Sequence, residues 1–432
     1  MAAPEQELPP LAGLYAAYGI ESAEKQAAIA RAHDVFRRHH ARFVTSIAVQ
    51  MLPDLRRDVA ANPGARIVFL GRDGYSLGIA IRTLDPEFFA AHCHDAVLSR
   101  IVVEAAVQDL EKNGGKKFPQ IHGYREISSS VPPQDVDGAY QRLTRYLRGS
   151  GVPVGVGGSH VTLVDTGLKG TVQELMAASY PQTEFTGRMM FYKGMSSDPH
   201  PGTKKGYTLD LDQGDGGGFR ELPDDPALTW ARIPGIRTIE NSLQGPLNSP
   251  KRIGEQGPVQ SRLTDVPDRT WGCNPILVDE SYKDPQVREA CKVVALRAVL
   301  DAANEVRDGA PLEPVAAQQE FTHQVRAWLT RSPDVDPELK VVMDSFVHRD
   351  DHKMVRQLDD LIEKSGLSPE ATQQIWESFE VATSMQDKKG VIERVHSLRA
   401  VAGHGVAGAQ GEPAAQHHRP SQPGRRADGP AL

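Results

Sequence analysis

Two short segments of the chain combine glycines, an acid and a base directly after an apolar run. Residues 66–70 are followed by Gly71-Arg72-Asp73-Gly74, and residues 161–164 are followed by Asp165-Thr166-Gly167-Leu168-Lys169-Gly170-Thr171. The bare amides of a glycine-rich turn at the start of a helix attract anions, phosphates above all. Two such turns in one domain therefore predict a phosphorylated ligand that is bound from two sides.

The side chains of the first turn suit phosphate binding and catalysis. Arg72 can form a fork of two hydrogen bonds to a phosphate, and Gly74 lets the backbone approach an anion closely. The Asp73 carboxylate can hold a metal ion or orient a hydroxyl, so we predict it to be catalytic. The alternative interpretation is a tight strand-to-helix turn in which Asp73 only caps the helix.

The second turn predicts an anion cradle beside an acid. Asp165 is the only charged residue that closes its apolar strand, and we predict it to be catalytic and to bind a metal ion. Lys169 supplies a point charge, and the amides or hydroxyls that can donate to phosphate are those of Thr166, Gly167, Gly170 and Thr171. The order of residues differs from a Walker A loop. A capped turn is again the alternative.

A third apolar run, residues 96–98, ends in Ser99-Arg100. An arginine at a strand end beside the two turns would add another cationic contact for a phosphate, with Ser99 as a neighbouring hydroxyl. A surface salt bridge is the alternative for Arg100.

These residues need a framework that brings them together. The apolar runs at 66–70, 96–98, 161–165 and 185–193 predict buried strands, and helices are predicted at 22–60, 77–84, 101–112, 139–148, 172–178 and 284–306. This alternation predicts an α/β fold, with a mostly parallel Rossmann-like sheet, an N-terminal helical segment and a C-terminal helical unit. In such sheets ligands bind beyond the carboxyl ends of the strands.

Composition along the chain suggests four parts. Residues 1–60 form the helical segment and residues 61–312 the phosphate-binding domain, interrupted at 196–275 by a stretch rich in Gly and Pro that predicts a lid or an insertion. Residues 313–400 form the helical unit, which could serve as a surface for a protein partner. Residues 401–432 have almost nothing to bury, which predicts a disordered tail.

The composition of the whole chain excludes several classes. A net charge of −7 over 432 residues argues against a nucleic-acid partner. No apolar run approaches the roughly 18 residues of a membrane span, and residues 1–7 lack the layout of a signal peptide. The three cysteines are too widely spaced for a disulfide framework or a zinc cluster. We therefore expect a cytoplasmic protein with no membrane partner.

On these motifs the chain resembles the type I phosphoribosyltransferase fold. That family binds pyrophosphate with a Gly-rich loop that carries a basic residue, similar to Arg72-Asp73-Gly74. Its second loop opens with acids, closes in Gly-Thr and binds the ribose phosphate, similar to residues 165–171. The resemblance implies a transferase with Mg²⁺ as cofactor. The family has two adjacent acids in the second loop, whereas Val164 precedes Asp165 here.

The chain also resembles the haloacid-dehalogenase-like phosphohydrolases. Asp73-Gly74 is similar to the end of their Asp-x-Asp-Gly motif, Ser99 to their second motif and Asp165 to their metal-binding acid. Gly71 stands at the nucleophile position, and glycine cannot form a phospho-enzyme. Predicted dehalogenase-superfamily proteins of bacterial polysaccharide gene clusters carry a similar series of motifs, with a later Glu that corresponds to Glu240 here.

The leading expectation is a phosphoribosyltransferase-like enzyme that acts on a phosphorylated ribose or nucleotide-type substrate. The alternatives are a dehalogenase-like phosphohydrolase in which Asp73 and Asp165 act on a metal-bound water, and a non-catalytic module that binds a phosphorylated ligand.

Overall fold

The computed structural model describes residues 8–71, 74–212, 221–262, 272–382 and 384–406. The chain divides into two compact units, Met1–Arg356 and Gln357–Leu432. The helices of the first unit are α1 (Leu11–Ala17), α2 (Ala23–Phe36), α3 (Arg42–Ala61), α4 (Tyr75–Leu84), α5 (Pro86–His92), α6 (Arg100–Lys112), α7 (Ala139–Gly149), α8 (Thr171–Ser179), α9 (Ile233–Leu243), α10 (Pro285–Arg307), α11 (Pro314–Thr330) and α12 (Pro337–Phe346). Helix α13 (His352–Glu363) contains the boundary, and α14 (Pro369–Val381) and α15 (Met385–Val406) belong to the second unit.

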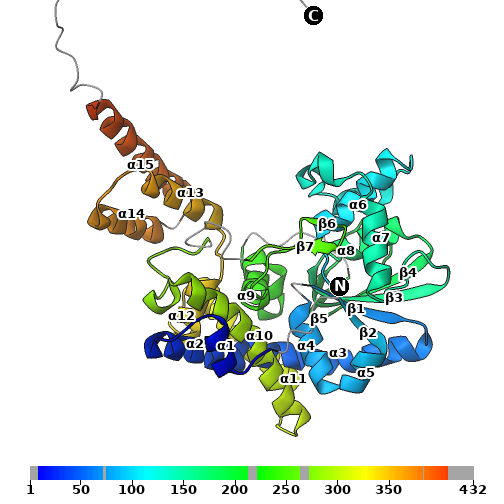
Figure 1. Cartoon of the computed structure of the whole chain (residues 1–432). Helices are drawn as coiled ribbons and strands as arrows, with labels where there is room; N and C mark the ends of the chain where they lie inside the picture. The colour runs from blue at the N-terminus through cyan, green and yellow to red at the C-terminus, as the bar shows by residue number, and fades with distance from the viewer. Residues whose placement is uncertain (1–7, 72–73, 213–220, 263–271, 383, 407–432) are drawn as a thin grey trace, which may run out of the picture. The chain divides into compact units, whose positions relative to one another are not determined.

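Five strands of the first unit form one sheet, in the order β2-β1-β3-β4-β5, and all neighbouring strands are parallel (Figure 1). They are β1 (Arg66–Leu70), β2 (Cys93–Ala96), β3 (Ser159–Leu168), β4 (Thr183–Lys193) and β5 (Lys204–Leu211). The strands β6 (Arg252–Gly254) and β7 (Gly257–Val259) form a separate antiparallel hairpin. The predicted α/β class with a parallel Rossmann-like sheet is confirmed.

Helices cover both faces of this sheet, as a buried parallel sheet requires. Side chains alternate along β1, so that Ile67 and Phe69 join a core with α3, α4 and α10. Val68 and Leu70 join the opposite core, which contains residues of α6, α7 and α8. Figure 1 shows α3, α4 and α5 on one side of the sheet and α6, α7 and α8 on the other.

The N-terminal helical segment is part of the first unit. A π-helical turn, Arg37–Ala41, joins α2 to α3, so residues 23–61 are helical throughout. The unit extends past the expected boundary at 312, because Phe321 and Trp328 of α11 are buried in the same core as Phe43 of α3. The C-terminal helical unit proper therefore begins at Gln357.

The stretch at 196–275 contains regular structure that its composition did not predict. It includes the edge strand β5, helix α9 and the hairpin of β6 and β7. Strand β5 begins Lys204-Lys205-Gly206, which lacks the apolar run of a central strand. Its pairing with β4 is nevertheless parallel from Gly187 to Lys193.

The second unit has its own buried side chains, among them Trp376 and Phe379, whose ring centroids lie 5.9 Å apart. Helix α15 continues to Val406, and the rest of the predicted tail lies outside the described residues. No helix in the described part of the chain is long and apolar enough to cross a membrane.

Candidate functional site

A pocket of about 1240 Å³ lies at the carboxyl ends of the central strands. Leu70 of β1 and the next residue, Gly71, belong to its wall, and β3 contributes Asp165, Gly167 and Leu168. Strand β1 lies between β2 and β3, where the order of the sheet reverses. This is the place at which open α/β sheets bind their ligands.

The structure brings most of the predicted residues to this one pocket. Its lining includes Ser99, Arg100, Asp165, Gly167, Lys169, Gly170 and Thr171. Gly74 and Thr166 are not among the lining residues, and the Thr166 side chain is fully buried. Arg72 and Asp73, the basic and acidic residues of the first turn, lie outside the described residues.

Gly74 has a packing reason to be glycine. Its amide donates to the carbonyl of Leu70 at 2.7 Å. A Cβ atom at this position would lie 2.7 Å from the Leu70 oxygen and 2.8 Å from the Val164 oxygen. Because both obstacles are backbone atoms of the central strands, a larger residue at position 74 would push β1 and β3 apart.

The second turn brings the start of a helix to the pocket. Gly170 has a φ of 73°, a left-handed conformation that favours glycine, and α8 begins at the next residue. Thr171 and Val172, the first two residues of α8, both line the pocket. The N-terminal amides of an α-helix have no partners within the helix and attract negative charge.

A second helix N-terminus reaches the pocket after β2. Ser99 caps α6, because its Oγ accepts a hydrogen bond from the Val102 amide at 3.3 Å. The same Oγ donates to the carbonyl of Pro250 at 2.6 Å, which fastens the segment before β6 to this end of α6. Arg100 and Ile101, the first residues of α6, line the pocket. Two helix N-termini thus border one cavity.

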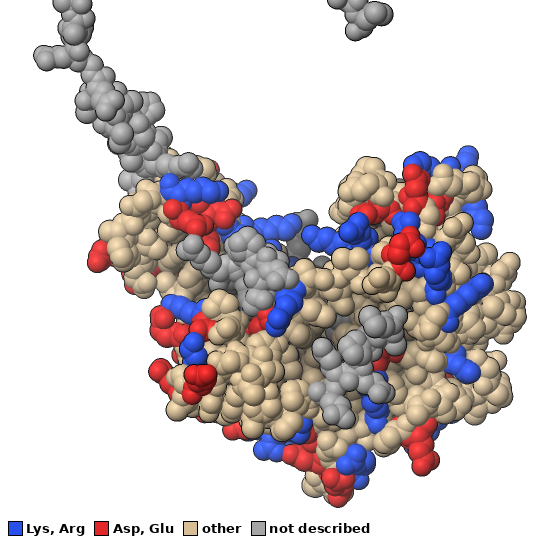
Figure 2. Space-filling model, in the orientation of Figure 1, with Lys and Arg blue, Asp and Glu red and all other residues tan. Residues whose placement is uncertain are grey.

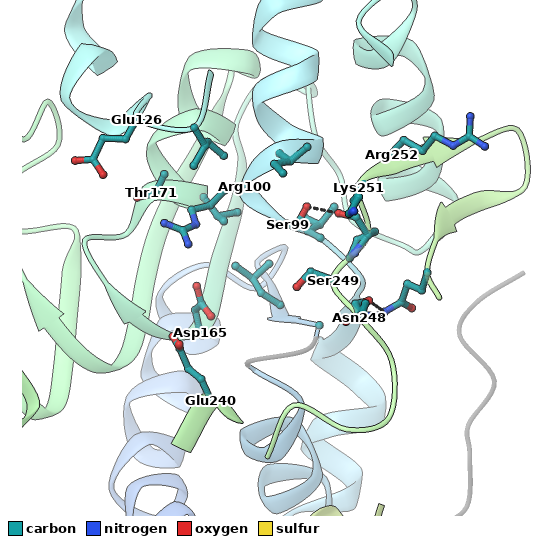
Figure 3. Close-up of a pocket in the computed structure, with 18 of the residues that line it drawn as sticks. Ser99, Arg100, Glu126, Asp165, Thr171, Glu240, Asn248, Ser249, Lys251 and Arg252 are labelled. Atoms are coloured by element: carbon teal, nitrogen blue, oxygen red, sulfur yellow. Dashed lines mark hydrogen bonds between the residues drawn. The ribbon is translucent and has the colours of Figure 1, made fainter. Parts of the chain in front are cut away.

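The remaining wall comes from the stretches at 126–135 and 233–261. Arg237 and Glu240 of α9 line the pocket, as do Asn248–Arg252. Figure 3 shows the Glu240 side chain extending toward Asp165, with Lys251 across the pocket from them. Apart from Glu240, which the polysaccharide-cluster resemblance indicated, sequence reasoning missed these residues. The spacing of Ile236, Ile239 and Leu243, all buried, was the signal for α9.

Two of the basic side chains that line the pocket lie close to acidic side chains. Lys169 Nζ lies 2.7 Å from Glu126 Oε1, and Arg237 Nη1 lies 3.6 Å from Asp350 Oδ1. On the face drawn in Figure 2, basic and acidic side chains of the first unit are interspersed. The grouping of Arg100, Lys169 and Lys251 around the pocket is therefore not part of a larger basic surface on that face.

The oxygen donors of the pocket suit a magnesium ion only together with a ligand. Within the described residues, no group of three or more His, Cys, Asp or Glu side chains could hold a metal. Asp165 and Glu240 supply two carboxylates. Mg²⁺ is typically bound through one or two carboxylates, waters and substrate phosphates, so this pair fits a phosphate-dependent Mg²⁺ site.

We expect Glu126→Gln to strengthen binding of an anionic ligand by about two- to fivefold. The Glu126 side chain is 70% exposed, and an exposed ion pair contributes at most about 1 kcal/mol, so the loss of this competitor frees Lys169 at little structural cost. Calorimetric titration with inorganic pyrophosphate measures the change. Glu255→Gln is the control, since Glu255 pairs with Arg145 outside the pocket. Equal or weaker binding by Glu126→Gln would show that the ligand does not use Lys169.

Comparisons of the chain with protein-family models, with curated proteins and with solved structures found no match. The fold and the site define a protein with a Rossmann-like parallel α/β sheet and a pocket at the carboxyl edge of that sheet.

Proposed function

We propose that the chain is a phosphoribosyltransferase-like enzyme that binds a phosphorylated ribose or nucleotide-type substrate in this pocket. The observation that carries the proposal is the convergence of the α6 and α8 N-termini, with Arg100 and Lys169, around Asp165 and Glu240. Amides and cations bind phosphate oxygens, whereas carboxylates bind sugar hydroxyls or a metal ion. A phosphorylated sugar presents both kinds of group.

Each residue then has a defined role. Thr171 and the first amides of α8 bind one phosphate, and Arg100 with the start of α6 binds another. Lys169 balances the charge of the leaving pyrophosphate as its bond to the anomeric carbon breaks and the nucleophilic atom of the acceptor bonds to that carbon. Asp165 orients the ribose hydroxyls or holds Mg²⁺ together with Glu240. When bound, Mg²⁺ would neutralise negative charge on the leaving group.

Phosphate-ester hydrolysis is the second candidate. The observation in its favour is that Gly71, Ser99 and Asp165 line one pocket, as the dehalogenase-like resemblance implies. Gly71 and Ser99 follow β1 and β2, and Asp165 lies near the end of the adjacent strand β3. In this reading Asp165 and Asp73 would activate a metal-bound water, because Gly71 cannot act as a nucleophile.

Titration calorimetry with phosphoribosyl pyrophosphate and Mg²⁺ tests the first candidate. We expect binding by the unaltered protein and a loss of about tenfold or more in Arg100→Gln and Asp165→Asn, since each variant removes a charged contact. Arg145→Gln, outside the pocket, is the matched control for Arg100 and should bind normally. No binding, or binding unchanged by Asp165→Asn, would refute the transferase.

The same variants separate the alternatives. Turnover of a generic phosphomonoester that is lost in Asp165→Asn would favour the hydrolase. Binding of a phosphorylated ligand without turnover in either assay would favour a non-catalytic module.

A further inference from the structure

A buried group of charges adjoins the second turn without lining the pocket. Lys204, the first residue of β5, places its Nζ 2.5 Å from Glu174 Oε1 and 2.9 Å from Asp198 Oδ2. Glu174 is in the first turn of α8, and Asp198 is in the connection between β4 and β5. The exposed fractions of the Lys204, Glu174 and Asp198 side chains are 0%, 0% and 5%.

Both carboxylates of this group contact the Lys204 ammonium. A buried carboxylate without a cationic partner costs several kcal/mol, and here one ammonium lies between two buried carboxylates. Burial by itself raises the pKa of Asp198, but hydrogen bonds from Lys204 and the His200 amide bring it below its ordinary value. His200 Nδ1, 2.7 Å from Glu174 Oε2, is a further partner on the exposed side.

The same lysine lies against the turn that borders the pocket. A Cβ atom on Gly170 would lie 2.7 Å from both Cδ and Cε of Lys204, so the methylene chain of the lysine runs directly along this glycine. A hydrogen bond nearby also joins α8 to the residue before β5, since Gln173 Nε2 donates to Thr203 Oγ1 at 2.9 Å. The first turn of α8 is therefore fastened to the chain before β5.

Charge adds a second effect to this packing. Glu174 is four residues after Gly170, and an acid in the first helical turn interacts favourably with the positive end of the helix dipole. If its charge were not offset, Glu174 would compete with an anionic ligand for that end of α8 and would repel the ligand. Lys204 offsets this charge from within the protein.

We infer that Lys204 is a positioning residue of the anion site: it holds the Gly170-Thr171 turn against β5 and neutralises Glu174, so that the α8 amides remain available to a ligand phosphate. The inference rests on the proposed binding of a phosphorylated ligand. Lys204 does not line the pocket, so its effect must pass through the turn and through Glu174.

The test compares Lys204→Met with Lys205→Met in two measurements on the full chain. Lys205 is the adjacent residue, but it pairs with Asp54 and is 46% exposed. We expect Lys204→Met to weaken the binding of inorganic pyrophosphate with Mg²⁺ by about tenfold or more, because two carboxylates lose their cation. It should also speed amide hydrogen exchange in residues 170–175 of the ligand-free protein. Lys205→Met should change neither measurement.

A charge rescue separates positioning from general stability. Adding Glu174→Gln to Lys204→Met removes the uncompensated charge next to the turn and should recover about threefold or more of the lost affinity. If Lys204→Met does not fold, Lys204→Gln, which retains a donor to the acids, replaces it with the same directions of change. A folded Lys204 variant with unchanged affinity, or a double variant without recovery, would overturn the inference. If the unaltered protein binds no phosphate compound, the proposed function fails, whereas the exchange rates still decide whether Lys204 holds the turn.

Discussion

Replacing Arg125 by methionine is expected to lower the free energy of unfolding by about 3–5 kcal/mol, because it leaves a buried carboxylate without its cation. The Arg125 guanidinium lies 2.7 Å from Glu104 Oε1 and 2.7 Å from Glu111 Oε1, both on α6. The Glu104 side chain is 0% exposed and that of Arg125 is 16% exposed. Chemical denaturation followed by circular dichroism measures the loss.

The control is Lys112, a basic residue of the same helix, α6. Lys112 pairs with Asp137 at 2.7 Å, but the two side chains are 56% and 63% exposed, so Lys112→Met should lower the free energy of unfolding far less than Arg125→Met. A second variant, Arg125→Met with Glu104→Leu, removes the buried charge as well and should regain most of the lost stability. Equal losses in Arg125→Met and Lys112→Met would show that burial does not set the strength of these pairs.

The Arg125 contacts also bear on the pocket. Glu126 and Ile127, which follow Arg125 directly, line the pocket, and Gln108 Nε2 of α6 donates to the carbonyl of Ser128 at 2.9 Å. Arg125 and Gln108 therefore fasten this stretch of the wall to α6. A loss of pyrophosphate affinity in Arg125→Met, beyond the effect of Glu126→Gln, would measure that support.

A buried histidine is expected to make the fold sensitive to mild acid. The His40 side chain is 0% exposed and lies between the rings of Phe36 and Phe321, with centroid distances of 5.2 and 4.8 Å. Burial lowers the pKa of His40 from 6.5 to about 3. Below pH 6.5 the unfolded chain binds a proton at this residue and the folded chain does not, so stability falls as the pH falls until about pH 3.

The expected contribution of His40 is about 1.4 kcal/mol per pH unit, or about 2 kcal/mol between pH 6.5 and pH 5. The measurement is urea unfolding at several pH values for the unaltered protein and for His40→Leu. The difference between the two slopes isolates His40 from the other titrating groups. His323→Gln, which replaces an exposed histidine, is the control for the loss of an imidazole. Parallel curves for His40→Leu and the unaltered protein would rule out a neutral buried His40.

The sequence predicted the central elements of the fold because their signals are local. Strands β1 and β3 are apolar runs buried on both faces, and each is followed by glycine and a helix. Strand β5 was missed, since an edge strand that begins with two lysines resembles a loop. The side chain of its first lysine, Lys204, is fully buried because two acids outside the strand are its partners. They are Glu174 of α8 and Asp198 of the connection between β4 and β5.

The candidate site shows the same division. Residue type and immediate neighbours account for Ser99 as a helix cap and for Gly170 as a left-handed turn residue. They also account for the order of acid, lysine and threonine from the end of β3 to the start of α8. Glu126, Glu240 and Lys251 come to the same pocket from segments with no motif in common. The sequence thus determined where the turns and helix ends lie. Only the tertiary structure decided which charges meet, because Coulomb interactions depend on distances in space that sequence spacing does not set.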